Sequence, residues 1–577
     1  MVGWKIAFFF LQLLFIPRFS QAQDYVLRLQ YADTQSTADT LKFSFSDSLA
    51  LHRFSDYLID SLQAEGYLNL ESNLQIKPDN RFFLQVDAGT QFKWIQLGKG
   101  NLEPWMESSL DGGAIIAGES PFRIEAVQHL MGQILETGQN NGYPFMAVKL
   151  DSIELDNGQL RASLYMEKGP LITFDTLRIT GSSKIQPIYL ARKTGIIPGN
   201  PFSQKKVNKL REVLKNSVPY LALSGSPEMS FQNEEATIYL PVEDRKMNAI
   251  DGIIGFLPNE IEANKWLVTG QFDLQLYNVS GKGRDYQLNW QRLTQYSQNL
   301  RVAAREPYVL GSQLDLGAAF SLLKEDTTFL NRDFSLRLGY QVTANTYIDF
   351  FSKWQAGDLL EVGRYENATE LPEVGDFRYN SYGADFSFTD VDDPIVPKSG
   401  WRSKLTLGIG NKTLRENTGI DPALYAGIER ESLQYYIRGA VDYYYRLDKN
   451  FSSRVSLQAG ELNNSNLLLN DLYRLGGLQS IRGFNENFFY SSRYAYMNLE
   501  PRYYFGNYSY FLLFTDLGML EDAVRKRERD WPFSFGAGLS LETAGGMFNF
   551  VYALGKSAGQ PLGFNYSRIH FGFTGRF

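Results

Sequence analysis

One arginine and two acids late in the chain are the residues best suited to specific chemistry. Arg482 lies in a glycine-rich stretch, residues 476–484, which reads GGLQSIRGF. Glycine permits backbone folding that other residues resist, and a guanidinium held in a folded loop has five donors that need acceptors. Glu500 and Asp516 follow soon after. The pattern predicts a charge-assisted clamp between the loop and the two carboxylates; the alternative is three ordinary charges lining a polar channel.

Other kinds of reactive site find little support. The chain has no cysteine, which excludes disulfides, thiolate metal sites and thiol nucleophiles. The three histidines, His52, His129 and His570, are too scattered to indicate a metal site or a catalytic triad. The sequence has no Gly-x-Ser-x-Gly elbow, and the glycines at 281 and 283 lack the length and following helix of a phosphate loop. We therefore expect no enzymatic activity and no cofactor.

Length and composition point to several folded domains. The 577 residues exceed what one hydrophobic core holds. Hydrophobic residues make up 44% of the chain and charged residues 21%, which excludes a disordered protein. The net charge of -7 gives no support to nucleic-acid binding, because that function needs a concentrated basic surface.

The N-terminus has the pattern of a secretory signal. Lys5 precedes an apolar segment from Ile6 to Ile16, and Ser20-Gln21-Ala22 suits cleavage before Gln23. This segment is too short to cross about 30 Å of hydrocarbon as a helix, and no longer apolar run follows. We predict a signal peptide at residues 1–22. Any membrane insertion must then use a closed barrel, since only helices and closed barrels satisfy all backbone groups in lipid.

Residues 24–243 repeat one order of elements three times, a helical stretch followed by two strands. The first two helices end at Gly66 and Gly142, about 76 residues apart, and Ser120-Pro121 has the pattern of a helix start. The pattern predicts three copies of one small α+β domain, at 23–90, 91–169 and 170–245. The alternative is three small α+β domains that are unrelated to one another. Each is expected to hold a three-stranded sheet whose open edge can accept an extended client as an added strand.

From residue 248 the pattern changes to period two, which indicates strands with one apolar face. We predict sixteen strands, near 248–258, 265–278, 283–293, 297–305, 312–323, 333–341, 345–356, 379–389, 401–411, 430–446, 451–461, 492–505, 508–519, 532–542, 546–555 and 565–577. Long connections follow the seventh, ninth, eleventh, thirteenth and fifteenth strands, and short ones follow the second, sixth, twelfth and fourteenth. Strict alternation of this kind predicts a transmembrane barrel of sixteen antiparallel strands, residues 246–577, rather than a soluble sandwich.

Strand parity predicts where the acids point. Glu500 shares its parity on the twelfth strand with Arg502, opposite to the apolar residues, and is expected to face the lumen. Asp516 on the thirteenth strand shares its parity with Phe514, so its direction is left open. Pro501 predicts a bulge or weakened pairing.

Several motifs resemble those of the Omp85 superfamily of outer-membrane translocation and assembly barrels. The core Ile481-Arg482-Gly483-Phe484 resembles the family's loop signature, and Phe514-x-Asp516-x-Gly518 resembles its wall motif. Residues 392–400 resemble its Pro-and-Gly turn, in which a calcium-binding reading of the aspartates is the weaker alternative. The last strand, with Phe571, Phe573 and Phe577, resembles the C-terminal recognition strand of outer-membrane proteins, and residues 177–202 resemble a POTRA domain.

The resemblance implies a fold and a set of site residues. It implies a membrane β-barrel of sixteen antiparallel strands preceded by three POTRA-like α+β domains in the periplasm of a Gram-negative bacterium, most similar to the TamA-like and BamA-like branch. The loop is implied to enter the lumen and to contact acids on the wall. The clamp residues would be Gly477, Ile481, Arg482, Gly483 and Phe484, and the wall partners Glu500, Asp516 and Gly518.

The resemblance also implies insertion or translocation of client polypeptides. Gly252 and Gly255 in the short first strand, paired with a glycine-containing last strand, predict a seam that can open for a client strand. The expected partners are the outer-membrane bilayer and unfolded outer-membrane or secreted proteins, with an inner-membrane or lipoprotein partner as a further candidate. A single-client secretion pore, a passive channel and lipid export stay open as alternatives, although a third repeat is unlike the secretion-pore branch.

Overall fold

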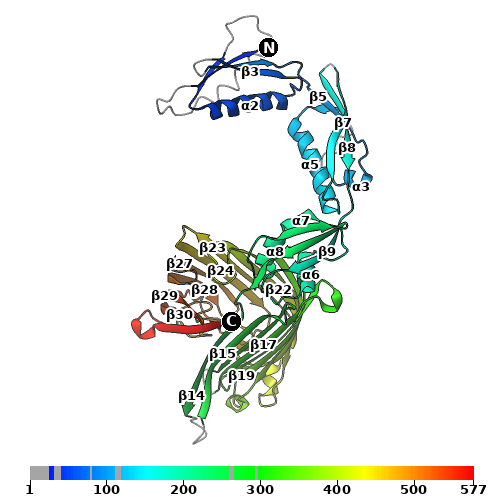
Figure 1. The fold of residues 1–577 in the computed structure, drawn as a ribbon. Coiled ribbons are helices and arrows are strands. Elements are labelled where there is room, and N and C mark those ends of the chain that lie inside the picture. Colours follow the sequence, from blue (N-terminus) through cyan, green and yellow to red (C-terminus); the bar gives the residue numbers. More distant parts are fainter. Residues whose placement is uncertain are drawn as a thin grey trace. The chain divides into compact units, whose positions relative to one another are not determined.

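The computed structural model describes residues 25–31, 41–77, 81–110, 119–156, 158–258, 266–292 and 296–577. The predicted signal peptide lies outside these residues. The chain divides into two compact units, one reaching to Thr173 with Pro201–Lys205 and the other formed by Phe174–Asn200 with Lys206–Phe577 (Figure 1). None of the helices in the described ranges has both the length and the apolar character needed to cross a membrane.

The first module is a four-stranded mixed sheet packed on one helix. Its elements are β1 (Tyr25–Tyr31), β2 (Leu41–Phe45), α2 (Ser48–Ala64), β3 (Glu71–Lys77) and β4 (Arg81–Asp87). The strand order is β2-β1-β4-β3, with β1 parallel to β4. Helix α2 begins where the Asp47 carboxylate accepts the Ala50 N–H at 2.7 Å. Its buried Leu51, Leu58 and Leu62 join the apolar cluster that contains the sheet residues Leu27 and Leu84.

The second module repeats this topology. It contains β5 (Trp94–Gly98), α3 (Pro104–Glu107), β6 (Glu119–Pro121), α5 (Ile124–Asn140), β7 (Ala147–Asp156) and β8 (Gln159–Glu167), with strand order β6-β5-β8-β7 and β5 parallel to β8. The predicted helix start at Ser120-Pro121 is wrong, because both residues lie in β6 and pair with β5. Proline is tolerated there since β6 is an edge strand. The prediction of three-stranded sheets is also wrong for these two modules, because each has an additional short edge strand.

The third module has the predicted short first helix, but the predicted second helix is divided into two short helices, the first of which begins at Gln204. It contains β9 (Thr173–Ile179), α6 (Pro187–Thr194), α7 (Gln204–Asn208), α8 (Leu210–Ser217), β10 (Leu221–Leu223), β11 (Glu228–Gln232), β12 (Glu235–Leu240) and β13 (Val242–Asp244). Strands β11, β12 and β9 form a sheet, and β10 pairs with β13. This module is bonded to one end of the barrel, the near end: Gln186 donates its N–H to the Gly281 carbonyl at 2.8 Å, and the Ser217 hydroxyl donates to the Ala344 carbonyl at 2.7 Å.

Sixteen of the remaining strands form a closed antiparallel barrel in sequence order, which confirms the predicted fold class. They are β14 (Ala249–Pro258), β15 (Trp266–Val279), β16 (Arg284–Arg292), β17 (Gln298–Glu306), β18 (Leu314–Glu325), β19 (Phe329–Gln341), β20 (Thr346–Leu359), β21 (Asp376–Val391), β22 (Gly400–Arg415), β23 (Glu431–Arg446), β24 (Phe451–Asn463), β27 (Arg493–Tyr504), β28 (Tyr510–Glu521), β29 (Phe533–Thr543), β30 (Gly546–Lys556) and β31 (Arg568–Arg576). All sixteen predicted strands are present, and β19 to β22 extend beyond the predicted bounds.

The alternation of loop lengths is real but not strict. At the far end, opposite to the third module, long segments 360–375, 416–430 and 464–492 connect strands, yet β18 and β19 are joined there by only residues 326–328. At the near end the turn 392–399 is longer than that connection. The expectation of strict alternation is therefore wrong, because a tight hairpin turn can close either end of a strand pair.

Side chains alternate between the two faces of the wall. Outward residues are apolar and exposed, such as Tyr382 at 65% and Leu513 at 63%, whereas inward residues include Asp385 and Glu500, which are buried. This alternation of an apolar exterior with a polar interior is the pattern of a membrane barrel.

Candidate lumen clamp

The segment 464–492 folds back as a loop stabilised by its own short hairpin. It contains the turn η6 (Leu469–Asp471) and the paired strands β25 (Tyr473–Leu475) and β26 (Phe489–Ser491). Gly477 and Gly483 adopt positive φ angles of 90° and 85°. A Cβ atom on Gly483 would lie 2.9 Å from the backbone of Leu554 and Gly555 in β30. Glycine at this position therefore lets the loop backbone approach the barrel wall closely.

The Arg482 side chain binds both predicted acids. Its Nε and Nη2 donate to the two oxygens of Asp516 at 2.9 and 2.7 Å, and its Nη1 donates to Glu500 at 2.7 Å. The Arg482 backbone N–H donates to Asp516 as well, at 2.9 Å. The bidentate geometry fixes the orientation of the guanidinium as well as its position.

The charges around Arg482 balance one another in a buried setting. Arg502 donates to the remaining oxygen of Glu500 at 2.8 Å, so two guanidinium groups face two carboxylates. Arg482, Glu500, Arg502 and Asp516 are each less than one-tenth exposed. Burial alone would lower the pKa of Arg482, but the hydrogen bonds with Asp516 and the charges of both acids raise it above its usual range. The guanidinium therefore stays charged, and each member depends on its partners.

Apolar contacts hold the loop on both sides of the arginine. Ile481 and Phe484 are fully buried in a cluster with Tyr494, Tyr496 and Leu520 of the wall. The guanidinium carbon of Arg482 lies 3.7 Å from the centre of the Phe514 ring, a cation–π contact. The loop is therefore fixed by packing and by charge together.

The far end of the barrel is covered by its own loops. Val374, Ile420, Leu468 and Leu472 from three loop segments are buried in one cluster with the strand residue Phe377. The Leu469 N–H donates to the Glu373 carbonyl at 2.7 Å. Beneath this cluster Lys412 and Asp471 form an ion pair that is almost completely buried. The same segment that carries Arg482 thus also packs into the cover of the far end.

The join between the first and last strands is short. Strand β14 pairs with β15 along its whole length, but with β31 at only three positions, Ala249 with Arg576, Ile250 with Gly575 and Asp251 with Thr574. One further hydrogen bond runs from the Phe577 N–H to the Asn248 carbonyl at 3.2 Å. The barrel is therefore closed at this join near one end only.

Comparison with known proteins identifies the family. Residues 278–577 match the Omp85 superfamily domain. The chain belongs to the Omp85 superfamily. CdiB from Escherichia coli is similar to it with 12% identity and a TM-score of 0.54, covering 92% of this chain and 98% of that chain. CdiB from Acinetobacter baumannii is similar with 12% identity and a TM-score of 0.51, covering 92% and 97%.

A third solved structure is BamA from Haemophilus ducreyi lacking POTRA domains 1–3, with 15% identity, a TM-score of 0.43 and coverage of 83% of this chain and 98% of that chain. The likeness to the two CdiB structures concerns the fold, since the identities are low. A search of curated proteins gave no match.

The structure places Arg482 of the loop against Glu500 and Asp516 of the wall, whereas the predicted clamp residue Gly477 lies against Glu486 of the loop itself. Asp516 faces inward with Phe514, which answers the question that parity left open, because both are buried whereas Leu513 and Leu517, of the opposite parity, are exposed on the outside. A Cβ on Gly518 would lie 2.9 Å from Ile481, so this glycine makes room for the loop. Pairing between β27 and β28 is interrupted at Glu500 and Pro501 without a change of register, which is weakened pairing rather than a bulge.

The predicted seam residues are not paired with one another. Gly252 and Gly255 pair with Phe272 and Thr269 of β15. Phe571 and Phe573 pair with β30 and expose their rings on the outer face, and Phe577 lies just beyond the end of β31. None of these five residues belongs to the three pairs that close the described part of the join.

Sequence reasoning missed several contacts of the Omp85 loop. The sequence places Arg502 on the lumen face but does not by itself predict its hydrogen bond to Glu500, although the two residues share a parity and lie two positions apart. The Asn498 side chain donates to the Ser480 carbonyl at 2.9 Å, and the Gln560 side chain donates to the Gly483 carbonyl at 3.1 Å. Strand parity indicates the contact of Arg502 with Glu500. Nothing in the sequence indicates the contact of Gln560 with Gly483, because these two loops come together only when the barrel is closed.

The predicted turn at 392–400, of which the structure leaves 392–399 between β21 and β22, is organised by its own aspartates. One oxygen of Asp392 accepts the N–H groups of Lys398 and Ser399, at 2.9 and 3.0 Å. Asp393 accepts the N–H of Val396 at 2.9 Å. No group of metal-binding side chains suited to an ion occurs among the described residues. The aspartates therefore act as turn caps.

Proposed function

We propose that this Omp85 protein inserts or translocates client polypeptides at the outer membrane of a Gram-negative bacterium, through the join between β14 and β31. The proposal rests chiefly on the three-pair join, since every other neighbouring strand pair of the barrel runs along most of the strand length. Family membership supports the same function. The predicted boundaries at 23–90, 91–169, 170–245 and 246–577 belong to this proposal, with the first three domains in the periplasm.

The short join offers a place for strand addition. Beyond Asp251 the β14 backbone has its ladder partner on the β15 side, which leaves donors and acceptors on the other side for an incoming strand. A client strand that adds there uses main-chain hydrogen bonds and needs little sequence specificity. Because one set of strand hydrogen bonds replaces another, the exchange requires no nucleotide.

The clamp is proposed to keep the rest of the wall closed while the join opens. The loop is bonded to β27 and β28 through Glu500 and Asp516, and Gly483 lies against β30. Opening is then restricted to the strands beyond this braced part. Loss of the brace would spread the opening over more of the wall.

The first two modules offer further edges for an extended client. Strands β3 and β7 are the outermost strands of their sheets, and they expose Ile76 at 70% and Ile153 at 56%. An exposed apolar edge strand is a template for pairing with another chain. We propose that unfolded clients bind there before they reach the barrel.

A disulfide across the join tests the proposal. Asp251 and Thr574 are paired, and the Thr574 hydroxyl donates to the Asp251 carboxylate at 3.4 Å. Because the chain has no cysteine, D251C with T574C creates a unique pair. In vesicles supplied with newly made barrel proteins, we expect oxidation to reduce client insertion about tenfold or more, and reductant to restore it.

The matched control is A319C with S335C, a paired position of β18 and β19 away from the join. Oxidation of this control should leave insertion unchanged. Normal insertion through a verified disulfide at 251 and 574 would reject the lateral route. A passive channel is less well supported, since the loop and the buried cluster at the far end occupy the path; conductance with and without residues 476–490 separates that alternative.

A further inference from the structure

The lumen face of the last strand carries two ionisable side chains beside the open part of the join. Along β31, Ile569 and Phe571 are exposed on the outer face, so Arg568 and His570 lie on the lumen face. Strand β31 pairs with β14 only from Thr574 onward. Arg568 and His570 therefore border the stretch at which a client strand is proposed to enter.

The hydrogen-bonding capacity of both side chains is incompletely used. Nε of Arg568 and Nε2 of His570 are buried and have no hydrogen-bond partner, although nearly all buried polar groups in folded proteins have one. Arg568 donates from Nη1 to the carbonyl of the adjacent Ser567 at 3.2 Å. The charged groups that act on His570 are Arg568 and Arg482, both of them cations. This part of the lumen face is therefore suited to an anionic group.

The strands that border the open part of the join supply no acid at this level. The two strands next to β31 present only apolar residues or glycine in register with Arg568 and His570, namely Ala553 and Val551 of β30 and Gly536 and Gly538 of β29. The clamp acids are already bonded to Arg482. Across the join, residues 252–258 of β14 read GIIGFLP and include no ionisable side chain. Charge in the strands beside the opening therefore comes from β31.

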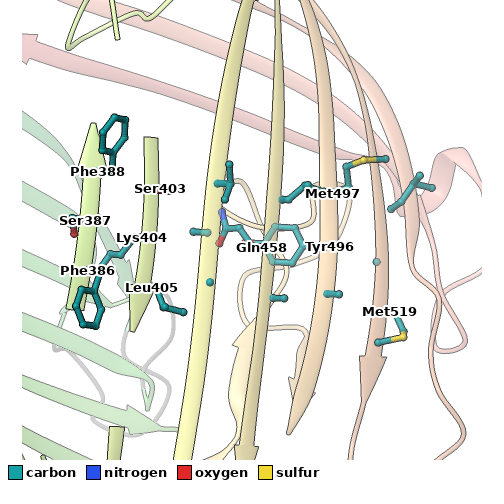
Figure 2. A pocket seen from close by; sticks show the side chains of 18 of the residues that line it. Phe386, Ser387, Phe388, Ser403, Lys404, Leu405, Gln458, Tyr496, Met497 and Met519 are labelled. Carbon is teal, nitrogen blue, oxygen red and sulfur yellow. The ribbon is translucent and has the colours of Figure 1, made fainter. Parts of the chain in front are cut away.

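A groove of ≈ 840 Å³ on the outer face of the wall, between β20 and β29, is a different kind of recess (Figure 2). Its lining is mainly apolar and includes Phe386, Leu405 and Met497. The strands from β21 to β28 are hydrogen-bonded on both sides there, so a client strand would leave its backbone groups unpaired in lipid. Discrimination between client strands is therefore expected at the join and not at this groove.

We propose that Arg568 and His570 select client strands that carry acidic side chains on their lumen-facing row, an inference that rests on the proposed entry of clients at the join. A strand that adds to β14 beyond Asp251 has β31 on its other side, and every second side chain of it points into the lumen. Side chains on one face of adjacent strands lie about 4.5–5.5 Å apart, where opposite charges attract. A client carboxylate would also give the buried Nε of Arg568 a charge-assisted hydrogen bond. Main-chain bonds then hold the strand, and the charged row distinguishes one client from another.

Reversing the charge of Arg568 tests the proposal. The full chain in phosphatidylcholine vesicles is supplied with a model eight-stranded barrel whose first and last strands each carry either Asp or Lys at two lumen-facing positions. We expect the wild type to insert the Asp client about fivefold faster than the Lys client. Arg568→Glu should reverse this preference, which loss of a purely structural contact would not do.

The matched control is Arg301→Glu, which reverses an exposed lumen-facing arginine of β17, away from the join. It should keep the preference of the wild type. Folding of each variant is verified by its heat-dependent gel mobility. His570→Glu, for which we expect the same reversal, is the second test of the row if Arg568→Glu fails to fold.

The outcomes separate the possibilities. Reversal by Arg568→Glu or His570→Glu with an unchanged preference in the control supports the proposal. Equal insertion of the two clients by the wild type overturns it, as does a preference that the β31 variants leave intact. A preference that vanishes when a short extension moves the client's C-terminal carboxylate assigns recognition to the chain end and also overturns it. Insertion of both clients through the disulfide at 251 and 574 would reject the proposed function, whereas a charge-independent rate that this disulfide still blocks would reject the present inference alone.

Discussion

Two joins of the barrel wall, β27 with β28 and β14 with β31, are built in opposite ways. The first is crossed by a buried set of four charges, in which Arg482 links acids from the two strands. The second is crossed by three residue pairs near one end. The loop that reinforces the first join extends its contacts as far as β30, one strand before the second. A strongly stabilised join and a weakly paired join are therefore close together in the wall. This arrangement suits a barrel that opens at one place only.

Removing an acid should weaken the stiff join most. Asp516→Ala leaves Arg482 buried without its main partner, and an uncompensated buried charge costs about 3–5 kcal/mol. We expect the midpoint of urea unfolding to fall, as measured by heat-dependent gel mobility after equilibration. The matched control is Glu416→Ala, which removes an exposed partner of Arg430 and should cost at most about 1 kcal/mol. Equal effects of the two variants would show that the clamp does not brace the wall.

The approach of the loop to β30 predicts the next largest effect. Gly483→Ala combines a positive φ angle with a Cβ placed against the backbone of Leu554 and Gly555, so we expect a cost of about 2–3 kcal/mol. Gly427→Ala has a similar φ of 80° but no atom within 4 Å of the added Cβ. It should cost only about 1 kcal/mol. The difference between the two variants, measured by the same unfolding assay, isolates the contact.

Hydrogen exchange sharpens the comparison without a mutation. Amides of β31 and of β14 beyond Asp251 should exchange about tenfold or more faster than amides of β27 and β28, because few hydrogen bonds must break to open the short join. Mass spectrometry of the full chain in lipid nanodiscs resolves these segments. Slow exchange throughout β14 would contradict a weak join.

The repeating elements of this fold were predictable because local pattern determines them. Period two and turn residues located all sixteen strands, but β22 runs to Arg415 rather than 411, since polar residues such as Lys412 continue the ladder above the apolar belt. The edge strands β2 and β6 were missed because three to five residues give too little periodicity. The helix start predicted at Ser120-Pro121 was wrong because proline fits the first turn of a helix and an edge strand equally well.

The clamp was predictable in its centre and not at its margins. Parity and a family motif brought Arg482, Glu500 and Asp516 into one hypothesis. The contact of Gln560 with Gly483 could not be predicted from the sequence, since it depends on closure of the barrel. The short pairing of β14 with β31 was likewise outside the sequence signal. Glycines suggested a weak join, but register is set by the tilt and closure of the whole wall.

A third join, between the third module and the barrel, predicts the smallest effect. Lys193 of α6 donates to the Gln341 side chain at 3.1 Å. Burial lowers the pKa of Lys193 to about 8, against the opposing effect of Asp315. The folded junction therefore binds fewer protons than the separated one between pH 8 and about 10.4. The cost of burying this charge is present below pH 8 and is relieved as the pH rises through that interval.

Lys193→Met removes the charge and its pH dependence together. At pH 7 we expect amides of α6 to exchange more slowly in the variant than in the wild type, with the difference narrowing toward pH 10, because the wild-type lysine then loses its proton at little cost. Comparing both proteins at each pH cancels the intrinsic change in exchange rate. The exposed Lys209 provides the control Lys209→Met, which should follow the wild type at every pH. A difference between Lys193→Met and wild type that is constant with pH would assign the effect to side-chain packing and would contradict the proposed cost of burying the charge.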